Sequence, residues 1–350
     1  MKQIYFLASI YILTCINISA QTTHVISSLN GLEGMAINGN NLYISEDDAN
    51  KISKIDITDA SPSTTDVVTG LNIPIGVMFN GNDLYICELG ADKISKIDIT
   101  NLSAGTTPVV EGLNKPYKTI LNGNDLYIIE YGANKISKIN INDPTPTLTD
   151  VVTGLDRPLE ILLNGNDLYI AEYGAGKVSK INITAPIPTT TTDVINGLDG
   201  PAGLSLDNNN LYISEYDSGD ISKINILDAT PSTTDIATGL TTPAVTIIYN
   251  NELYITECTA SMISKYTLST LSINNFLLNN KTTLFPNPTS DFVQVSGLNK
   301  TENYSLYSIL GQKVKEGNIS NNENIDIQNL INGIYYLKFN NKNTLTFIKK

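Results

Sequence analysis

The sequence predicts an all-β protein, a six-bladed β-propeller with four antiparallel strands per blade, followed by a small β-sandwich. Three observations support this fold class. The tripeptide Leu-Tyr-Ile occurs six times at intervals of 42 or 43 residues, and no segment between the copies has helical periodicity. The last repeat lacks a fourth strand, which the start of the chain can supply.

The N-terminus has the three parts of a secretory signal peptide. Lys2 is a short basic start, residues 4–17 are apolar, and Ala20 is a small residue before the expected cut. We therefore assign residues 1–20 to a signal peptide. A lipoprotein attached through Cys15 is an alternative, although Thr14 before it fits poorly. No later apolar run is long enough for a transmembrane span.

The second repeat illustrates the order of strands within one blade. Residues 75–79 form the first strand, and Asn80-Gly81 begins a hairpin turn, because both residues tolerate positive φ. Residues 84–88, 93–99 and 107–110 follow as the second, third and fourth strands. Each blade should repeat this order.

The two ends of the repeat array are complementary. The sixth repeat stops after its third strand, residues 263–268, whereas residues 23–26 align with the fourth strand of the first repeat at residues 65–68. The first strand of the processed chain should therefore complete the last blade and close the ring over residues 21–268. This strand carries His24, the only histidine, far from the channel, where a structural role is expected.

The blade motif Leu-Tyr-Ile-x-Glu followed by Lys-Ile-Ser-Lys-Ile resembles the NHL, YWTD, TolB-like and streptogramin-lyase class of propellers, and more distantly the lactonase-like group. Most motif residues pack between blades, so the resemblance implies the fold more than an activity. Streptogramin lyases rely on a histidine near the channel, which is absent here. Lactonases hold a metal with Glu, Asn and Asp on inner strands, but Met78 and Ile120 occupy the expected mid-channel positions.

After a linker at residues 269–283, short strands at 292–295, 304–308, 334–339 and 345–349 alternate with Asn and Gly turns. Residues 284–350 resemble the type A sorting domain of the type IX secretion system through Leu-Phe-Pro-Asn-Pro, Gly-Gln-Lys-Val, Gly-Ile-Tyr-Tyr-Leu-Lys and the terminal Phe-Ile-Lys-Lys. The resemblance implies that this domain binds the secretion machinery, and that the protein is secreted or held on the outer-membrane surface.

Composition excludes several classes of function. A net charge of −13 argues against nucleic acid as a partner, since phosphate binding needs clustered Lys and Arg. A single histidine excludes histidine-based triads and histidine-rich metal sites. Cys87 and Cys258 lie in blades that are not neighbours, which favours free thiols over a disulfide.

Every blade carries a glutamate at the end of its second strand, and these six residues should form a ring near the channel mouth: Glu46, Glu88, Glu130, Glu172, Glu215 and Glu257. A lysine follows five residues later in the first four blades, at Lys51, Lys93, Lys135 and Lys177, and favours structural pairing. Blades five and six lack it. Together with Glu33 of the adjacent first blade, Glu46, Glu215 and Glu257 therefore form a candidate Ca²⁺ site.

Blades three and four carry polar side chains where the other repeats have mostly Gly, Ala and aliphatics, at Lys115, Tyr117, Lys118, Arg157 and Glu160. We predict a polarised mouth, with an acidic sector opposite a basic and aromatic one that binds a ligand. The alternative is that these differences are sequence drift without function in solvent-exposed loops. The favoured function is a secreted, non-catalytic binding or adhesion module for a protein, glycan or small molecule. The alternative function is a metal-dependent, lactonase-like hydrolase or lyase.

Overall fold

The computed structural model describes residues 22–268, 283–298, 300–309, 311–339 and 344–350. Two compact units divide the chain, with the boundary between Leu268 and Ser269. The expected signal peptide at residues 1–20, with Cys15, and nearly all of the expected linker at residues 269–283 lie outside the described residues.

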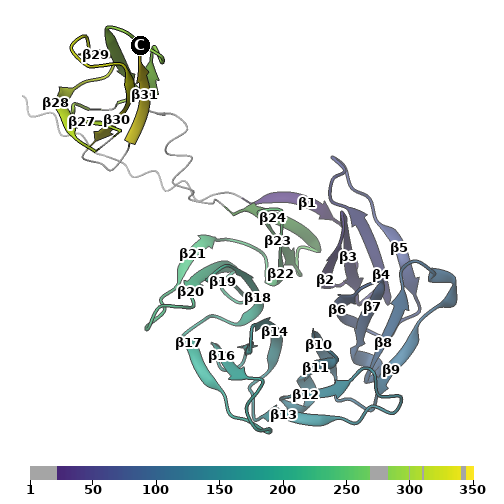
Figure 1. Cartoon of the computed structure of the whole chain (residues 1–350). Helices are drawn as coiled ribbons and strands as arrows, with labels where there is room; N and C mark the ends of the chain where they lie inside the picture. Colours follow the sequence, from purple (N-terminus) through teal and green to yellow (C-terminus); the bar gives the residue numbers. More distant parts are fainter. Residues whose placement is uncertain (1–21, 269–282, 299, 310, 340–343) are drawn as a thin grey trace, which may run out of the picture. The chain divides into compact units, whose positions relative to one another are not determined.

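Six antiparallel sheets of four strands are arranged around a common axis, as Figure 1 shows, and this confirms the predicted six-bladed propeller. The innermost strands are β2 (Leu32–Asn38), β6 (Pro74–Asn80), β10 (Pro116–Asn122), β14 (Pro158–Asn164), β18 (Pro201–Asp207) and β22 (Pro243–Tyr249). The second strands are β3 (Asn41–Glu46), β7 (Asp83–Glu88), β11 (Asp125–Glu130), β15 (Asp167–Glu172), β19 (Asn210–Glu215) and β23 (Glu252–Glu257).

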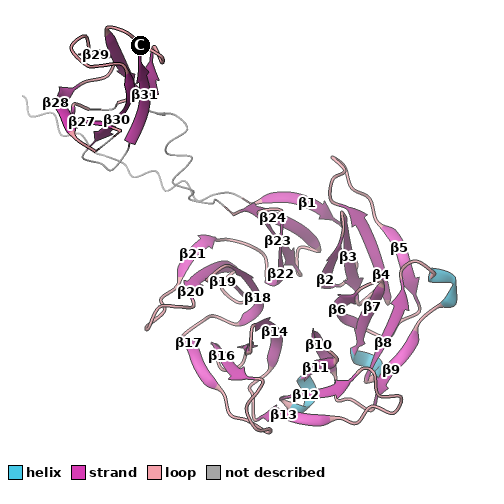
Figure 2. Cartoon of the chain, in the orientation of Figure 1, coloured by secondary structure: helices cyan, strands magenta, loops and turns pink. Residues whose placement is uncertain are grey.

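The third strands are β4 (Lys51–Asp56), β8 (Lys93–Asp98), β12 (Lys135–Asn140), β16 (Lys177–Asn182), β20 (Asp220–Asn225) and β24 (Met262–Thr267). The outermost strands are β5 (Thr65–Thr69), β9 (Thr107–Glu111), β13 (Thr149–Thr153), β17 (Thr192–Asn196), β21 (Thr234–Ala237) and, in the last blade, β1 (Thr23–Ser27). Short 3₁₀ turns at η1 (Leu89–Ala91), η2 (Leu102–Ala104) and η3 (Tyr131–Ala133) are the helical segments of the described residues (Figure 2).

Ring closure follows the predicted scheme. Strand β1 pairs antiparallel with β24, with Thr23 opposite Lys265 and Ile26 opposite Ile263, and completes the sheet β1-β24-β23-β22. His24 is exposed on this outermost strand. The edge of β24 is therefore covered rather than left open for pairing with another chain.

The Leu-Tyr-Ile repeats form the hydrophobic layers between neighbouring blades. Leu84 and Ile86 of the second blade are fully buried and pack with Val67 and Leu71 of the first. An equivalent cluster, which includes Leu42 of the first blade and Ile263 of the last, lies across the closing junction. The same apolar contact thus recurs around the ring, which explains why the tripeptide is retained in every repeat.

Both described cysteines are free, as the sequence favoured. Cys87 is fully buried, and burial raises the pKa of its thiol to about 12. Burial likewise raises the pKa of Cys258 to about 12. Neither thiol is therefore in its nucleophilic thiolate form at neutral pH.

The C-terminal unit is the predicted β-sandwich. Its strands are β25 (Thr283–Phe285), β26 (Phe292–Ser296), β27 (Glu302–Ser308), β28 (Lys313–Ile319), β29 (Glu323–Asp326), β30 (Gly333–Phe339) and β31 (Thr344–Lys349). They form the sheets β25-β26-β29 and β28-β27-β30-β31 around a core that contains Val293, Leu306, Leu337 and Phe347. No helix in the described part of the chain is long and apolar enough to cross a membrane.

We predict that a chain shortened to begin at Ser28, which loses β1, unfolds at a lower temperature. It loses the pairing with β24 and the contacts of the half-buried Val25 and Ile26, a loss of about 3 kcal/mol. The melting temperature of the propeller should fall by about 6–12 °C in calorimetry. As a control, a chain that ends at Leu268 keeps every blade and should melt with the intact propeller. Equal melting of the two shortened chains would contradict closure by β1.

Candidate functional site

The strand-end glutamates hold the loops between blades together. Glu130 accepts a hydrogen bond from the Ser137 hydroxyl at 2.6 Å and another from the backbone N–H of Asn114 at 3.0 Å. Lys135 lies 3.3 Å from the same carboxylate, so the predicted glutamate–lysine pairing is present. The carboxylate is 3% exposed. Its two hydrogen bonds join the second strand to the third strand and to the entry of its own blade.

The same two hydrogen bonds recur in all six blades. The serine partners of the other five glutamates are Ser53, Ser95, Ser179, Ser222 and Ser264. The backbone donors are Asn30, Asn72, Asp156, Asp199 and Thr241. Lys51, Lys93 and Lys177 lie 3.3–3.5 Å from their glutamates in the remaining lysine-bearing blades. Glu215 and Glu257 therefore keep the structural hydrogen bonds even without a lysine.

The geometry does not gather the four carboxylates of the expected Ca²⁺ site. Glu46, Glu215 and Glu257 are buried and engaged within their blades, whereas Glu33 lines the central pocket. Among the residues that the structure describes, no group of three or more His, Cys, Asp or Glu could hold a metal ion. The expectation of a shared site is corrected accordingly. In five of the six blades the residue after the glutamate, in the turn that follows the second strand, lines the pocket instead.

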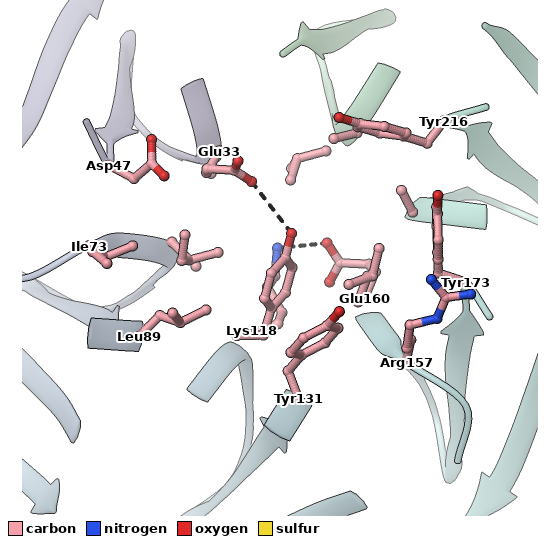
Figure 3. A pocket seen from close by; sticks show the side chains of 18 residues that line it. Glu33, Asp47, Ile73, Leu89, Lys118, Tyr131, Arg157, Glu160, Tyr173 and Tyr216 are labelled. Carbon is pink, nitrogen blue, oxygen red and sulfur yellow. Dashed lines mark hydrogen bonds and ion pairs between the residues drawn. The ribbon is translucent and has the colours of Figure 1, made fainter. Parts of the chain in front are cut away.

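A pocket of about 490 Å³ opens on the axis where the first strands begin and the second strands end. Its size is typical of small-ligand sites. Figure 3 shows Asp47 and Glu33 on one side and Arg157 and Tyr173 on the other, with Lys118 and Glu160 between them. Two carboxyls thus lie on one wall of the pocket, and the arginine with a tyrosine lies on the opposite wall.

Equivalent positions of the six repeats line this pocket. The second residue of each innermost strand is Glu33, Ile75, Tyr117, Leu159, Ala202 or Ala244. The residue after each strand-end glutamate is Asp47, Leu89, Tyr131, Tyr173 or Tyr216 in the five blades that reach the pocket. The Leu-Tyr-Ile strand, the strand-end glutamate and its serine partner are shared by all six repeats, but at these positions neighbouring blades carry an acid, an aliphatic or a tyrosine.

The acidic wall consists of Glu33 and Asp47. The hydroxyl of Tyr117, from the third blade, donates a hydrogen bond of 3.4 Å across the channel to Glu33 Oε2. Burial, and then the neighbouring Asp47 charge, raises the pKa of Glu33 to about 7. Burial also raises the pKa of Asp47. Two desolvated carboxyls side by side disfavour ionisation of both.

An ion pair between the third and fourth blades occupies the centre of the channel. Lys118 Nζ lies 2.8 Å from Glu160 Oε2, and Glu160 is 3% exposed. Burial raises the pKa of Glu160, and the adjacent Lys118 opposes this shift. A second cavity, of about 370 Å³ and lined mainly by residues further along the innermost strands, touches the same pair. The pair therefore separates two halves of the channel.

Glycines replace these two charged residues in three other blades. A Cβ on Gly34 would lie 2.2 Å from the carbonyl oxygen of Ile75, and one on Gly203 would lie 2.0 Å from that of Ala244. Gly76 is similarly close to the next strand. Neighbouring innermost strands approach too closely there for any side chain.

The basic and aromatic wall is centred on Arg157, the only arginine in the sequence. Its guanidinium lies 4.8 Å from the ring centroid of Tyr173, whose hydroxyl donates to Asp217 at 3.0 Å. Arg157 has a left-handed backbone with φ of 50°, and its N–H donates to the Asn134 side chain. The residue at the equivalent position has a positive φ in every blade, so this conformation belongs to the repeat and not to Arg157 alone.

The other predicted ligand residues are distributed as follows. Tyr117, Lys118 and Glu160 line the pocket. Lys115 occupies the position of Arg157 one blade earlier, with φ of 53°, but it is exposed and does not line the pocket. Sequence reasoning missed the aromatic residues Tyr131, Tyr173 and Tyr216, and the apolar residues Ile73 and Leu89, although aligning the residue after each strand-end glutamate would have shown four of the five.

Comparison with known proteins supports both parts of the architecture, a propeller with an axial pocket and an export domain in one chain. Residues 283–350 match the family described as the secretion system C-terminal sorting domain, which confirms the resemblance of this segment. The protein is thus secreted or displayed at the cell surface. No curated protein matches the chain.

Solved structures that resemble the chain are propellers. A streptogramin B lyase matches with 21% identity and a TM-score of 0.53, over 71% of this chain and 87% of that chain. A catalytically inactive virginiamycin B lyase from Staphylococcus aureus with quinupristin matches with 17% identity and a TM-score of 0.52, over 79% and 94%. A putative gluconolactonase matches with 14% identity and a TM-score of 0.59, over 71% and 93%. Identities this low show the shared fold alone.

We predict that Lys118 and Glu160 are strongly coupled in stability. Replacing Glu160 by Leu leaves a largely buried ammonium without its partner, and should cost about 3 kcal/mol. Lys118→Met should cost a similar amount, whereas the double variant should cost far less than the sum of the two. Urea unfolding of the four chains measures this coupling. Additive costs would show that the ion pair is not energetically important.

We also predict that Glu33 makes stability depend on pH. Its pKa of about 7 in the folded state lies above its ordinary value of 4.5, so the folded protein binds the proton more tightly. The stabilisation is complete below about pH 4.5 and is lost as the pH rises through about 7, a change of about 3 kcal/mol. Glu33→Gln should flatten the pH profile of urea unfolding over this interval. Parallel profiles for the two proteins would contradict the assignment.

Proposed function

We propose that the propeller is a non-catalytic binding module, exported by the type IX secretion system, that takes a small polar ligand in its central pocket. The observation that carries this proposal is the divergence of the repeats at the pocket. Blades share their Leu-Tyr-Ile core, strand-end glutamate and serine partner, but the residues that face the pocket differ in charge, size and aromaticity.

Physical reasoning supports a binding role for this pattern. The interior positions of the blades are fixed by packing and by the glutamate hydrogen bonds, so the fold does not require any given side chain at the mouth. An asymmetric set of side chains around a nearly symmetric ring presents opposite charges, tyrosine hydroxyls and apolar surface in one cavity. Few convergent polar groups in a largely apolar pocket are the usual design of a small-ligand site.

A second candidate function is hydrolase or lyase chemistry. The specific observation in its favour is Glu33, a carboxyl whose pKa is raised to about 7, hydrogen-bonded to the half-buried Tyr117. A carboxyl with this pKa is suited to act as a general acid or base. The streptogramin B lyase and the putative gluconolactonase share only the fold with this chain. Within the described part of the chain, Glu33 and Asp47 have no third His, Cys, Asp or Glu grouped with them, and a metal-dependent mechanism would need such a ligand.

Export gives the C-terminal unit its role. The sorting domain at residues 283–350 implies contact with the secretion machinery. We infer that residues 284–350 serve transport and the propeller acts afterwards, at the surface or in the medium, on a protein, glycan or small molecule found there.

We predict that a screen of glycans and small molecules against the chain from residue 21 to residue 350 yields a ligand of the mouth pocket. Tyr216→Ala and Arg157→Leu should each weaken its binding about tenfold in calorimetry, because each removes a wall of the cavity. Tyr249→Ala is the matched control, since Tyr249 is a half-buried tyrosine at the far end of β22. The Tyr249→Ala protein should bind the ligand with unchanged affinity.

Two results would oppose this proposal. Equal weakening by Tyr249→Ala would place the ligand elsewhere, and a complete screen without a ligand would remove the binding function. Mass spectrometry of the recovered ligand tests the second candidate. If the ligand is converted, and Glu33→Gln stops the conversion, the propeller is an enzyme.

A further inference from the structure

The acidic wall of the pocket contains carboxyls that the described residues leave without an ionic partner. Within residues 22–268, Glu33 and Asp47 each form no salt bridge. Lys118, which also lines the pocket, is paired with Glu160 at 2.8 Å. Arg157 lies on the opposite wall, against Tyr173. Lys118 thus neutralises the carboxylate of Glu160. The carboxyls of Glu33 and Asp47 line the cavity without a basic side chain to pair with them.

The position of Asp47 depends on a missing side chain. A Cβ on Gly31 would lie 1.8 Å from Asp47 Oδ1, so only glycine leaves room for this carboxylate. Gly31 precedes β2, at the place where Ile73 and Arg157 precede the first strands of their blades. The first blade therefore combines a small residue at the rim with two acids behind it, an arrangement specific to this side of the mouth.

Ionisation of Glu33 and Asp47 is disfavoured while no cation lies between them. Burial raises the pKa of Glu33 to about 7. The groups that act on it from the surrounding elements are Asp47, Asp48, Tyr117, Tyr216 and Cys258. None of these groups carries a positive charge; Asp47 and Asp48 raise the pKa of Glu33, and only the hydrogen bond from Tyr117 lowers it. A cation placed between the two carboxyls would supply the attraction that these neighbours do not, and would favour the ionised form of both.

Apolar and aromatic surface adjoins the acidic wall. Ile73, Ile75 and Leu89 lie on the neighbouring second blade, and Tyr131 and Tyr216 face the same cavity. Tyrosine rings attract cations through their faces and accept apolar groups by stacking. This surface suits the carbon skeleton of an organic ligand better than it suits a hydrated metal ion.

We propose that the mouth pocket binds a small organic ammonium compound, with its ammonium group between Glu33 and Asp47 and its apolar or aromatic body against Ile73, Leu89 and Tyr216. The inference rests on the proposed binding function and specifies the chemical class of its ligand. Three of the four conditions for such recognition are features of the cavity itself: carboxyls without an ionic partner, a tyrosine-rich wall and a volume of about 490 Å³. The fourth is that the protein's own cations are engaged elsewhere.

Three probes of equal body and different charge test the inference: phenethylamine, phenethyl alcohol and hydrocinnamate. At about pH 8, where Glu33 is ionised, the amine should bind about tenfold more tightly than the alcohol, and the carboxylate should bind least. The double variant Glu33→Gln, Asp47→Asn should abolish the preference for the amine. Asp48→Asn is the matched control, because Asp48 is exposed and does not line the pocket, and it should keep the preference.

Proton release gives an independent readout. At about pH 6, amine binding should release a proton from Glu33, because the bound ammonium favours the carboxylate. The measured binding enthalpy should then depend on the ionisation enthalpy of the buffer, and this dependence should disappear in Glu33→Gln. Phenethyl alcohol should show no such dependence.

The outcomes separate this inference from the binding function. Equal affinity for amine and alcohol, or a preference that survives in the double variant, overturns the ammonium proposal. So does a screen in which the pocket ligands carry no positive charge, although the binding function then stands. If Ca²⁺ binds to the protein and this binding is lost in Glu33→Gln, the ligand of the acidic wall is a metal ion and the organic ammonium proposal is wrong. A screen with no pocket ligand at all removes both proposals.

Discussion

Pairing of β1 with β24 is the constraint on which the rest of the propeller depends. The two strands come from opposite ends of the repeat array, and their register brings Ile26 opposite Ile263. Without this pairing, the last blade would have three strands and the apolar cluster that joins the first and last blades would be open on one side. Closure brings blade one beside blade six, so it also determines which side chains share the central pocket.

The strand-end glutamates link closure to the site. Each glutamate joins its second strand to the third strand and to the loop that enters the blade, through one serine and one backbone N–H. The adjoining residue is then held at the rim in the same way in every blade. Because this support uses backbone and serine groups common to all repeats, the rim residue itself can be Asp47, Leu89 or Tyr173 at little cost to the fold.

The sequence was sufficient to predict the number of blades, the closing strand, the lysine pairs of four glutamates and the sorting domain. It also located Tyr117, Lys118, Arg157 and Glu160 at the mouth. The shared Ca²⁺ site was not foreseen correctly, because the sequence shows that a glutamate ends each second strand but not that a serine and a backbone N–H of its own blade occupy its carboxylate. Tyr216, in the turn directly after Glu215, lines the cavity instead. The contact between Tyr117 and Glu33 joins blades one and three and depends on the three-dimensional ring, so no local pattern predicts it.

The two charged features of the channel have different consequences. Lys118 and Glu160 come from the neighbouring strands β10 and β14, and each provides the counterion of the other in the middle of the channel. Glu33 and Asp47 lie on one blade at the mouth, and neither forms a salt bridge within residues 22–268. A buried carboxylate that lacks an ionic partner lowers stability unless it is protonated or a ligand supplies the opposite charge. The fold pairs the central carboxylate of Glu160 with Lys118. It leaves the carboxyls of Glu33 and Asp47 without an ionic partner at the mouth, where a ligand can reach them. That placement is the physical argument for a recognition site at this end of the channel.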